Sequence, residues 1–126
     1  MAQSPNQIIE EIYSTGTVTN NEGKANANVQ SVIPRIQGAA LYEWIRRSGL
    51  TRTLEIGMGY GLSTLFICQA HADNGREGRH IAIDPGQKTT FESIGLLNIQ
   101  RAELSDRLEF FPVSYTHLTL PTNREV

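Results

Sequence analysis

The sequence predicts a single α/β domain whose core is a parallel β-sheet. Short apolar segments at residues 51–57, 80–84 and 107–111 are typical of buried strands, and helical patterns at 62–72 and 89–104 separate them. A glycine-rich turn follows the first strand, and an acidic residue ends the second. This alternation of strands and helices is typical of a parallel sheet with right-handed crossovers, because each helix returns the chain to the same edge.

The composition limits the classes of function. The chain has 126 residues, of which 39% are hydrophobic and 19% charged, as in ordinary globular domains. Its net charge of −2 provides no basic field for nucleic acid or an anionic membrane, and no apolar run approaches the ~18 residues of a membrane helix. The N-terminus shows no secretory signal, and the single cysteine allows no internal disulfide. We therefore expect a cytoplasmic protein without nucleic-acid or membrane partners, and we assign no metal ligand, with metal dependence left open.

An N-terminal helical lead-in is expected over residues 1–50, ahead of the first strand. Its first helix is expected to be capped by Ser4, with Pro5 in the first position and Gln7 closing a capping box. The following residues, 15–30, are polar and rich in asparagine and glycine, which predicts a mobile loop.

A second helix is predicted over residues 33–50. Pro34 suits its first turn, and Gly49 suits its C-terminal cap because glycine readily adopts the left-handed conformation that ends a helix. Its apolar residues fall roughly on one face, which comprises Ile33, Ile36, Ala40, Trp44 and Ile45. We expect Trp44 to anchor this helix in the core.

Residues 51–112 are expected to form the first half of the main domain. The helix predicted at 89–104 begins with a capping box, in which Thr89 precedes Glu92 by three residues. The side chains of the preceding helix suggest no catalytic group. Cys68 lies among apolar residues, which predicts a buried thiol rather than a nucleophile, and His71 and His80 flank a polar turn, which predicts surface positions.

The stretch LEIGMGYG, residues 54–61, joins the first strand to the next helix. In a parallel α/β sheet, ligands bind at the carboxyl ends of the strands, where glycines let the backbone approach a ligand closely. A dinucleotide fingerprint, G-x-G-x-x-G, does not fit, because Leu62 stands at the third glycine position and the glycine is Gly61. Glu55 would repel pyrophosphate and suits a ligand with a cationic end. A P-loop is excluded because no Gly-Lys-Ser/Thr follows.

LEIGMGYG resembles motif I of the class I S-adenosylmethionine (SAM) dependent methyltransferases, whose pattern is acid-x-Gly-x-Gly-x-Gly. IAIDP, residues 81–85, resembles their second motif, in which an acid closes the second strand. The resemblance covers residues 30–112 and implies a Rossmann-like SAM-methyltransferase fold, of which the chain holds the N-terminal part: the helical lead-in and strands 1–3 of the parallel sheet. The lead-in IQGAALYEWIRRSG looks like that of small-molecule O-methyltransferases.

The resemblance implies a role for each residue of a SAM site. The turn around the methionine and ribose parts of SAM would be formed by Gly57, Gly59 and Gly61. Glu55 would lie under the ammonium end, and Ser63 would neighbour the methionine carboxylate. Asp84 would accept hydrogen bonds from the ribose hydroxyls, since a carboxylate offers two acceptor oxygens to two vicinal donors.

Each of these residues also has a plainer interpretation. The glycines could serve as turn residues only, and Glu55 could be a solvated acid at a strand end. Asp84 precedes a proline and could simply start a turn, and Ser63 could be only a helix N-cap.

The implied activity is SAM-dependent methyl transfer to a small-molecule acceptor, with an O-methyltransferase as the expected type of enzyme. In the O-methyltransferases that resemble this chain, the catalytic base or metal ligands follow the fourth strand, so no catalytic residue is assigned here. Two alternatives stay open: an NAD(P)-binding Rossmann oxidoreductase, which Leu62 and Glu55 disfavour, and a non-catalytic fragment of the SAM-binding fold. An oligomer is also compatible with the sequence.

Residues 113–126 depart from the family pattern. After a third strand the family continues with a turn, a helix and a fourth strand, whereas VSYTHLTLPT, residues 113–122, resembles a translated sequencing-library adapter. We interpret 113–126 as a non-native tail, although VSYTHLTL also alternates like a strand, and Tyr115 and His117 receive no role. The first strand would then lack a partner on one flank, so we expect the chain to be inactive and either unstable or associated.

Overall fold

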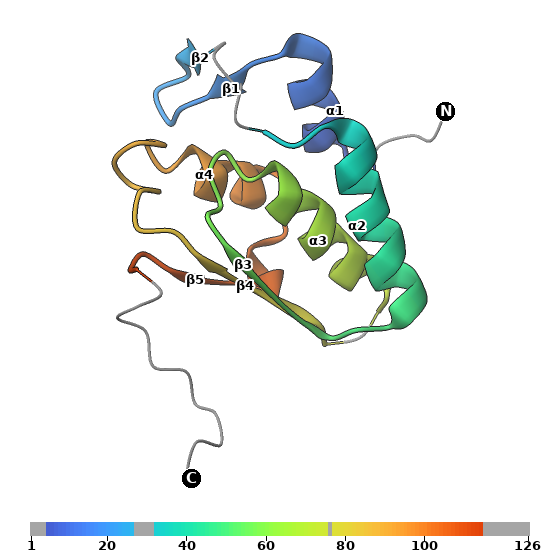
Figure 1. Cartoon of the computed structure of the whole chain (residues 1–126). Helices are drawn as coiled ribbons and strands as arrows, with labels where there is room; N and C mark the ends of the chain where they lie inside the picture. The colour runs from blue at the N-terminus through green and yellow to red at the C-terminus, as the bar shows by residue number, and fades with distance from the viewer. Residues whose placement is uncertain (1–4, 27–31, 76, 115–126) are drawn as a thin grey trace, which may run out of the picture.

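The computed structural model describes residues 5–26, 32–75 and 77–114 of the chain. Figure 1 shows the helices gathered on one side of a sheet whose strands all follow α2 in the chain. In chain order the elements are α1 (Gln7–Thr15), β1 (Val18–Thr19), β2 (Ala25–Asn26), α2 (Arg35–Ser48), β3 (Arg52–Ile56), α3 (Leu62–Asp73), β4 (Arg79–Ile83), α4 (Ile94–Arg101), the 3-10 helix η1 (Ser105–Arg107) and β5 (Leu108–Phe111).

The main sheet is parallel, with strand order β3-β4-β5, which confirms the α/β prediction. Within the described residues β3 pairs with β4 alone, so β3 forms an edge of the sheet. Successive side chains of a strand point to opposite faces, and Thr53 and Glu55 of β3 lie on the face that α3 covers. Leu54 and Ile56 point to the other face and are 52% and 59% exposed.

α2 packs on α3 through a narrow stripe of its surface. A Cβ atom at Gly38 would lie 2.1 Å from the Phe66 ring, so only glycine allows the two helices this close approach. Ile45 is buried on the same face, seven residues further along. Trp44 and Ile36 lie outside the stripe and are 66% and 77% exposed, so the prediction that Trp44 anchors the helix in the core is wrong. The close packing of α2 on α3 therefore depends on Gly38, and Trp44 does not take part in it.

α1 begins at a different cap from the predicted one. The side chain of Asn6 accepts a hydrogen bond from the Ile9 amide at 2.9 Å and caps the helix. The prediction that Pro5 occupies the first helical position is therefore wrong, and Ser4 lies outside the described residues. Asparagine and serine are both good capping residues, so residue type alone does not select between Ser4 and Asn6. In the helix that begins after Asn6, Ile9 and Ile12 are buried in the core.

The segment predicted as a mobile loop, 15–30, contains a small antiparallel pair of strands, β1 and β2. The Asn20 side chain closes the turn between them by accepting hydrogen bonds from the amides of Glu22 and Lys24 at 3.0 and 2.9 Å. Val18 is buried, which secures this hairpin against the domain. The loop prediction is therefore wrong for 18–26, and residues 27–30 lie outside the described part of the chain.

α4 is shorter than the predicted helix at 89–104. The amide of Ser93 donates to the Gln87 carbonyl at 2.7 Å, and both Glu92 and Ser93 have positive φ, of 51° and 59°. These contacts hold the chain in turns until Ile94, so Thr89 and Glu92 form no capping box. The hydrogen bonds of the buried residue Gln87 therefore decide where α4 begins, and the local capping pattern of Thr89 and Glu92 does not.

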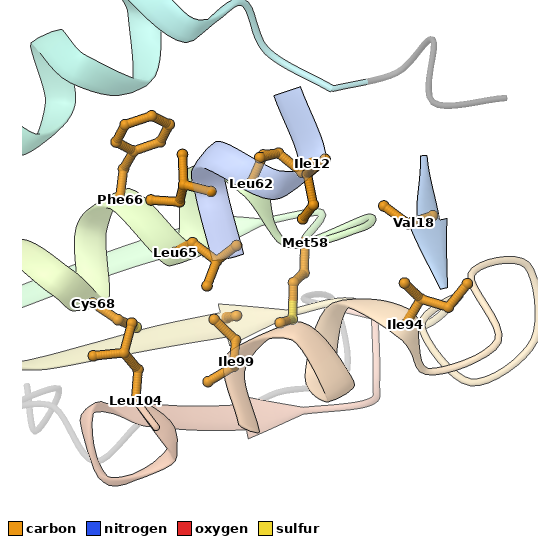
Figure 2. Close-up of a cluster of buried hydrophobic side chains, with 12 residues drawn as sticks. Ile12, Val18, Met58, Leu62, Leu65, Phe66, Cys68, Ile94, Ile99 and Leu104 are labelled. Carbon is orange, nitrogen blue, oxygen red and sulfur yellow. The ribbon is translucent and has the colours of Figure 1, made fainter. Parts of the chain in front are cut away.

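The main core lies where α3, α4 and the N-terminal part meet the sheet. Figure 2 shows its side chains, with labels on Ile12, Val18, Met58, Leu62, Leu65, Phe66, Cys68, Ile94, Ile99 and Leu104. Cys68 is fully buried, which confirms its predicted place, and burial, with a smaller effect of nearby Glu55, raises the pKa of its thiol to about 12. The thiol is therefore neutral and unsuited to nucleophilic attack at physiological pH.

Candidate functional site

The loop at residues 57–61 leads from the carboxyl end of β3 into α3 (Figure 1). Its three glycines have positive φ: 88° at Gly57, 58° at Gly59 and 90° at Gly61. At Gly61 space is limiting as well, because a Cβ atom would lie 3.1 Å from the carbonyl oxygen of Gly95 on α4. The predicted glycine turn is thus a tight left-handed loop that residues with side chains would strain.

Asp84 follows β4 and lies against this loop. Its Oδ2 accepts hydrogen bonds from the amides of Met58 and Gly59 at 3.1 and 3.0 Å, and its Oδ1 accepts one from the Gly86 amide at 3.1 Å. The side chain is almost fully buried. A carboxylate has about four acceptor positions, so Oδ1 keeps capacity for one further donor. Asp84 therefore starts a turn, as its plainer interpretation has it, and also fixes the glycine loop.

Gln87 completes the attachment of the loop and was not singled out by the sequence analysis. Its Nε2 donates to the Gly59 carbonyl at 2.7 Å and to Asp84 at 3.1 Å, and its Oε1 accepts from the Leu96 amide at 3.2 Å. The side chain has no exposed surface. A glutamine that follows an Asp-Pro-Gly turn carries no motif of its own, so only the tertiary contacts identify it.

Glu55 turns toward α3 rather than into solvent. Its Oε2 accepts a hydrogen bond from the Ser63 hydroxyl, and its Oε1 accepts from the Thr64 hydroxyl at 2.5 Å. The Nε2 atom of His80 lies 3.0 Å from Oε1, and 13% of the Glu55 side chain is exposed. The interpretation of Glu55 as a solvated acid is therefore wrong, and so is that of Ser63 as an N-cap, because Gly61 is the N-cap of α3.

His71 and His80 are fully buried, contrary to the prediction that they lie at the surface. Thr53 Oγ1 bridges them, at 2.9 Å from His71 Nε2 and 2.8 Å from His80 Nδ1. The polar turn between α3 and β4 is exposed, but the flanking residues belong to the helix and strand that pack together. Burial, then the nearby charges of His80 and Arg107, lower the pKa of His71.

A hollow of about 240 Å³ opens beside the glycine loop. The first residues of α3, Leu62 and Ser63, line it, and no side chain caps this helix, so first-turn amides remain for a ligand. Apolar side chains from outside the motif complete the lining, namely Val32, Ile33 and Phe91. Phe91 meets Tyr60 edge to face at 5.1 Å between ring centroids. None of these three residues was predicted as part of a site, because they approach the loop only in the folded chain.

A larger hollow, of about 600 Å³, lies at the amino ends of the strands. It is lined by charged residues of both signs, including Arg52, Arg79, Arg107, Asp106 and Glu109. We place the candidate site at the smaller hollow, because the glycine loop, which Asp84 holds, and the start of α3 line it at the carboxyl ends of the strands.

The described residues contain no group of three or more His, Cys, Asp or Glu side chains that could hold a metal ion. In the same part of the chain no helix has the length and apolar character needed to cross a membrane. The hollow itself offers backbone amides and an apolar wall, and the carboxylates of Asp84 and Glu55 lie against the glycine loop and the start of α3 rather than in its lining. This combination suits a ligand that carries both polar groups and an apolar or cationic part.

Comparison with known proteins gives one family. Residues 54–123 match the family model described as a methyltransferase domain. The match includes the last three residues of β3, the glycine loop, β4 and β5, and it runs on into the segment 113–126, which is interpreted from the sequence as non-native. No curated protein sequence matches the chain.

Solved structures match the fold. The O-methyltransferase from Bacillus cereus, in complex with SAH, is 26% identical, with a TM-score of 0.62 over 83% of this chain and 42% of that one. The SAH-bound methyltransferase from Podospora anserina is 14% identical, with a TM-score of 0.68 over 93% of this chain and 44% of that one. The O-methyltransferase TomG from Streptomyces achromogenes, in complex with SAM, is 16% identical, with a TM-score of 0.58 over 88% and 43%. The chain spans less than half the length of each.

Proposed function

The chain belongs to the methyltransferase domain family, and from this premise we propose that it binds SAM and forms part of an enzyme that methylates a small molecule. The observation that carries the proposal is the tight glycine loop between β3 and α3, which Asp84 holds at the edge of an apolar hollow. The Bacillus cereus O-methyltransferase, crystallised with SAH, supports the cofactor and favours an oxygen atom as the acceptor.

Asp84 and the glycines would bind the ribose side of SAM. Gly57, Gly59 and Gly61 let the backbone approach the ligand, because no side chain stands between them and the hollow. The remaining acceptor position on Oδ1 of Asp84 would take one ribose hydroxyl. Asp84 was expected from the family resemblance to receive both hydroxyls, whereas its hydrogen bonds to the loop leave room for one.

Glu55 and the start of α3 would bind the amino-acid end. The carboxylate of Glu55 would attract the ammonium group, while the amides at the start of α3 and the positive end of the helix dipole would receive the methionine carboxylate. Since the Ser63 hydroxyl donates to Glu55, the amide of Ser63 is the group left for the ligand.

SAM supplies an electrophilic methyl group that a bound nucleophile can accept by in-line displacement. The contribution of the chain is to orient the cofactor and exclude water on one side, with Val32, Ile33 and Phe91 as the apolar wall. No described residue of the site is placed as a general base. We therefore propose that the groups acting on the acceptor are supplied by the rest of the enzyme.

We also propose that this chain alone is inactive and represents part of the enzyme. In support, it spans 42% of the Bacillus cereus structure, and the edge strand β3 exposes Leu54 and Ile56 where a complete sheet would be covered. The non-native origin of residues 113–126 remains a prediction.

Calorimetric titration of the chain with SAH and with NADH tests the proposed function. We expect SAH to bind and NADH to bind more weakly or not at all, because Glu55 disfavours pyrophosphate. Gly61→Val is the matched negative control, since it blocks the loop without adding charge. Tighter binding of NADH than of SAH would favour the oxidoreductase alternative and contradict the proposal.

A further inference from the structure

A buried chain of polar side chains runs from the interior of the domain to the glycine loop. His71 of α3 contacts Thr53 of β3, Thr53 contacts His80 of β4, and His80 contacts Glu55 at the carboxyl-terminal part of β3. Both histidines have no exposed surface. Polar groups buried in this way need defined partners, because water cannot replace a missing hydrogen bond.

The positions of the hydrogen atoms follow from Glu55, the acceptor at the end of this line of hydrogen bonds. The hydroxyls of Ser63 and Thr64 both donate to Glu55, as they would to an ionised carboxylate. His80 Nε2 must then carry a proton to donate to Oε1. Its Nδ1 is the acceptor for the Thr53 hydroxyl, and Thr53 Oγ1 in turn accepts from His71 Nε2.

If the hydrogen bonds were donated in the opposite direction, the contacts at both His80 and His71 would be unfavourable. If Thr53 donated to His71 Nε2, His80 would hold its proton on Nδ1, and its bare Nε2 would face a Glu55 oxygen that is also an acceptor. His71 would then carry its proton on Nδ1, a buried atom that has no hydrogen-bond partner among the described residues. An unpaired buried donor and an acceptor facing an acceptor are both unfavourable.

We infer that His80, Thr53 and His71 are positioning residues, which hold Glu55 as an oriented carboxylate through a one-way hydrogen-bond chain with both imidazoles neutral and protonated on Nε2. The inference rests on the proposed function only in that the carboxylate would face the ammonium group of SAM. It explains why two histidines near the amino ends of the strands are buried and connected to an acid near the carboxyl end of β3.

The other titratable groups nearby agree with this arrangement. Burial is the main cause that lowers the pKa of His71, and the positive charge of Arg107 of η1 acts in the same direction, so the neutral form of His71 is favoured. Cys68 of α3 lies near Glu55, and its thiol is neutral because its pKa is raised to about 12. For His80 the neutral form follows from the contact with Thr53, whose hydroxyl donates to Nδ1, and the negative charge of Glu55 then remains available to a cationic ligand.

The tautomers can be observed directly by two-bond ¹⁵N–¹H correlation NMR of the histidine-labelled chain near pH 7. The chain has three histidines, and His117 serves as an internal reference. We expect the two other rings to show the neutral pattern with the proton on Nε2. A proton on Nδ1 of either ring, a charged imidazole, or titration of all three rings as free histidines would overturn the inference.

Thr53→Val removes the central hydroxyl while it keeps the shape of a strand-forming residue. We expect the His80 ring to lose its single tautomer and SAH affinity to fall roughly three- to tenfold, the effect of one lost buried hydrogen bond. Thr51→Val, at an exposed position just before β3, is the matched control and should change neither. Unchanged His80 signals in Thr53→Val would contradict the chain of contacts, whereas SAH that fails to bind the unsubstituted chain would contradict only the proposed function.

Discussion

Oδ2 of Asp84 lies 3.0 Å from the backbone nitrogen of Gly59, so the acid that follows β4 holds the loop that follows β3. The same oxygen accepts from the Met58 amide, and Gln87 donates to both Asp84 and the Gly59 carbonyl. Two strands that are neighbours in the sheet are thus joined at the ligand-binding end. The shape of the site depends on this junction as much as on the glycines.

Asp84→Asn should weaken the junction. Asparagine offers one acceptor oxygen and an NH₂ group, so at least one donor among the Met58, Gly59 and Gly86 amides would face another donor. We expect a loss of about 1–3 kcal/mol in the free energy of unfolding, measured by urea denaturation. Asp106→Asn, at an exposed position, is the control and should change stability by less than about 0.5 kcal/mol. Equal losses of stability in the two variants would contradict the stabilising role of Asp84 at this junction.

Gly61→Ala should strain the loop in two ways. The backbone there has a φ of 90°, and the added Cβ would lie 3.1 Å from the Gly95 carbonyl oxygen. We expect a cost of about 1–3 kcal/mol in thermal or urea unfolding and weaker SAH binding. Gly16→Ala is the matched control, because Gly16 also has positive φ, 69°, but no atom within 4 Å of its Cβ position. If Gly16→Ala loses as much stability and SAH affinity as Gly61→Ala, the contact with Gly95 does not contribute to either quantity.

Gln87→Leu should also destabilise the domain, although glutamine is not part of the motif. Leucine fills a similar volume but leaves the Gly59 carbonyl and the Leu96 amide without this partner. We expect a loss of about 1–3 kcal/mol, because unsatisfied buried polar groups are costly. Gln37→Leu on the exposed face of α2 is the comparison, and it should leave the melting temperature nearly unchanged. If Gln87→Leu left the stability of the domain unchanged, the glycine loop would keep its conformation without this side chain.

Stability should fall as the pH drops below about 6.5, the ordinary pKa of histidine. Burial lowers the pKa of His71 in the folded chain, so the unfolded chain binds a proton in this range that the folded chain does not. The free energy of unfolding therefore decreases from about pH 6.5 down to the native pKa of His71. Urea unfolding at a series of pH values measures this slope. His71→Asn should flatten it, and a slope that persists unchanged in this variant would assign it to other groups.

The exposed face of β3 should make the chain associate. Leu54 and Ile56 are more than half exposed on an edge strand whose second flank is unpaired within the described residues. We expect light scattering after gel filtration to find species larger than the monomer, and Leu54→Lys to shift them toward the monomer. Lys24→Arg, on the distant hairpin, controls for a surface change that keeps its charge. A monomer with a sharp cooperative melt would refute the expected instability.

Local signals in the sequence were sufficient for the strands and the glycine loop. The segments predicted for β3, β4 and β5 agree with the structure to within a residue or two, because the strands of a parallel sheet are short apolar runs with distinct ends. The C-terminal cap of α2 at Gly49 is also confirmed, with φ of 70°. Helix starts were less predictable: Asn6 replaced the expected cap of α1, and Ser93 ends the turns that delay α4.

The sequence by itself determined the order of strands and helices and the place of the glycine turn, since these depend on periodicity and on backbone conformations that only glycine adopts easily. Tertiary structure alone decided which polar residues meet. His71 and His80 border an exposed turn in the sequence, yet they are buried and connected to Glu55 through Thr53. Hydrogen bonds between residues far apart in the chain depend on strand register and helix packing, and neither leaves a local pattern that reading along the sequence could detect.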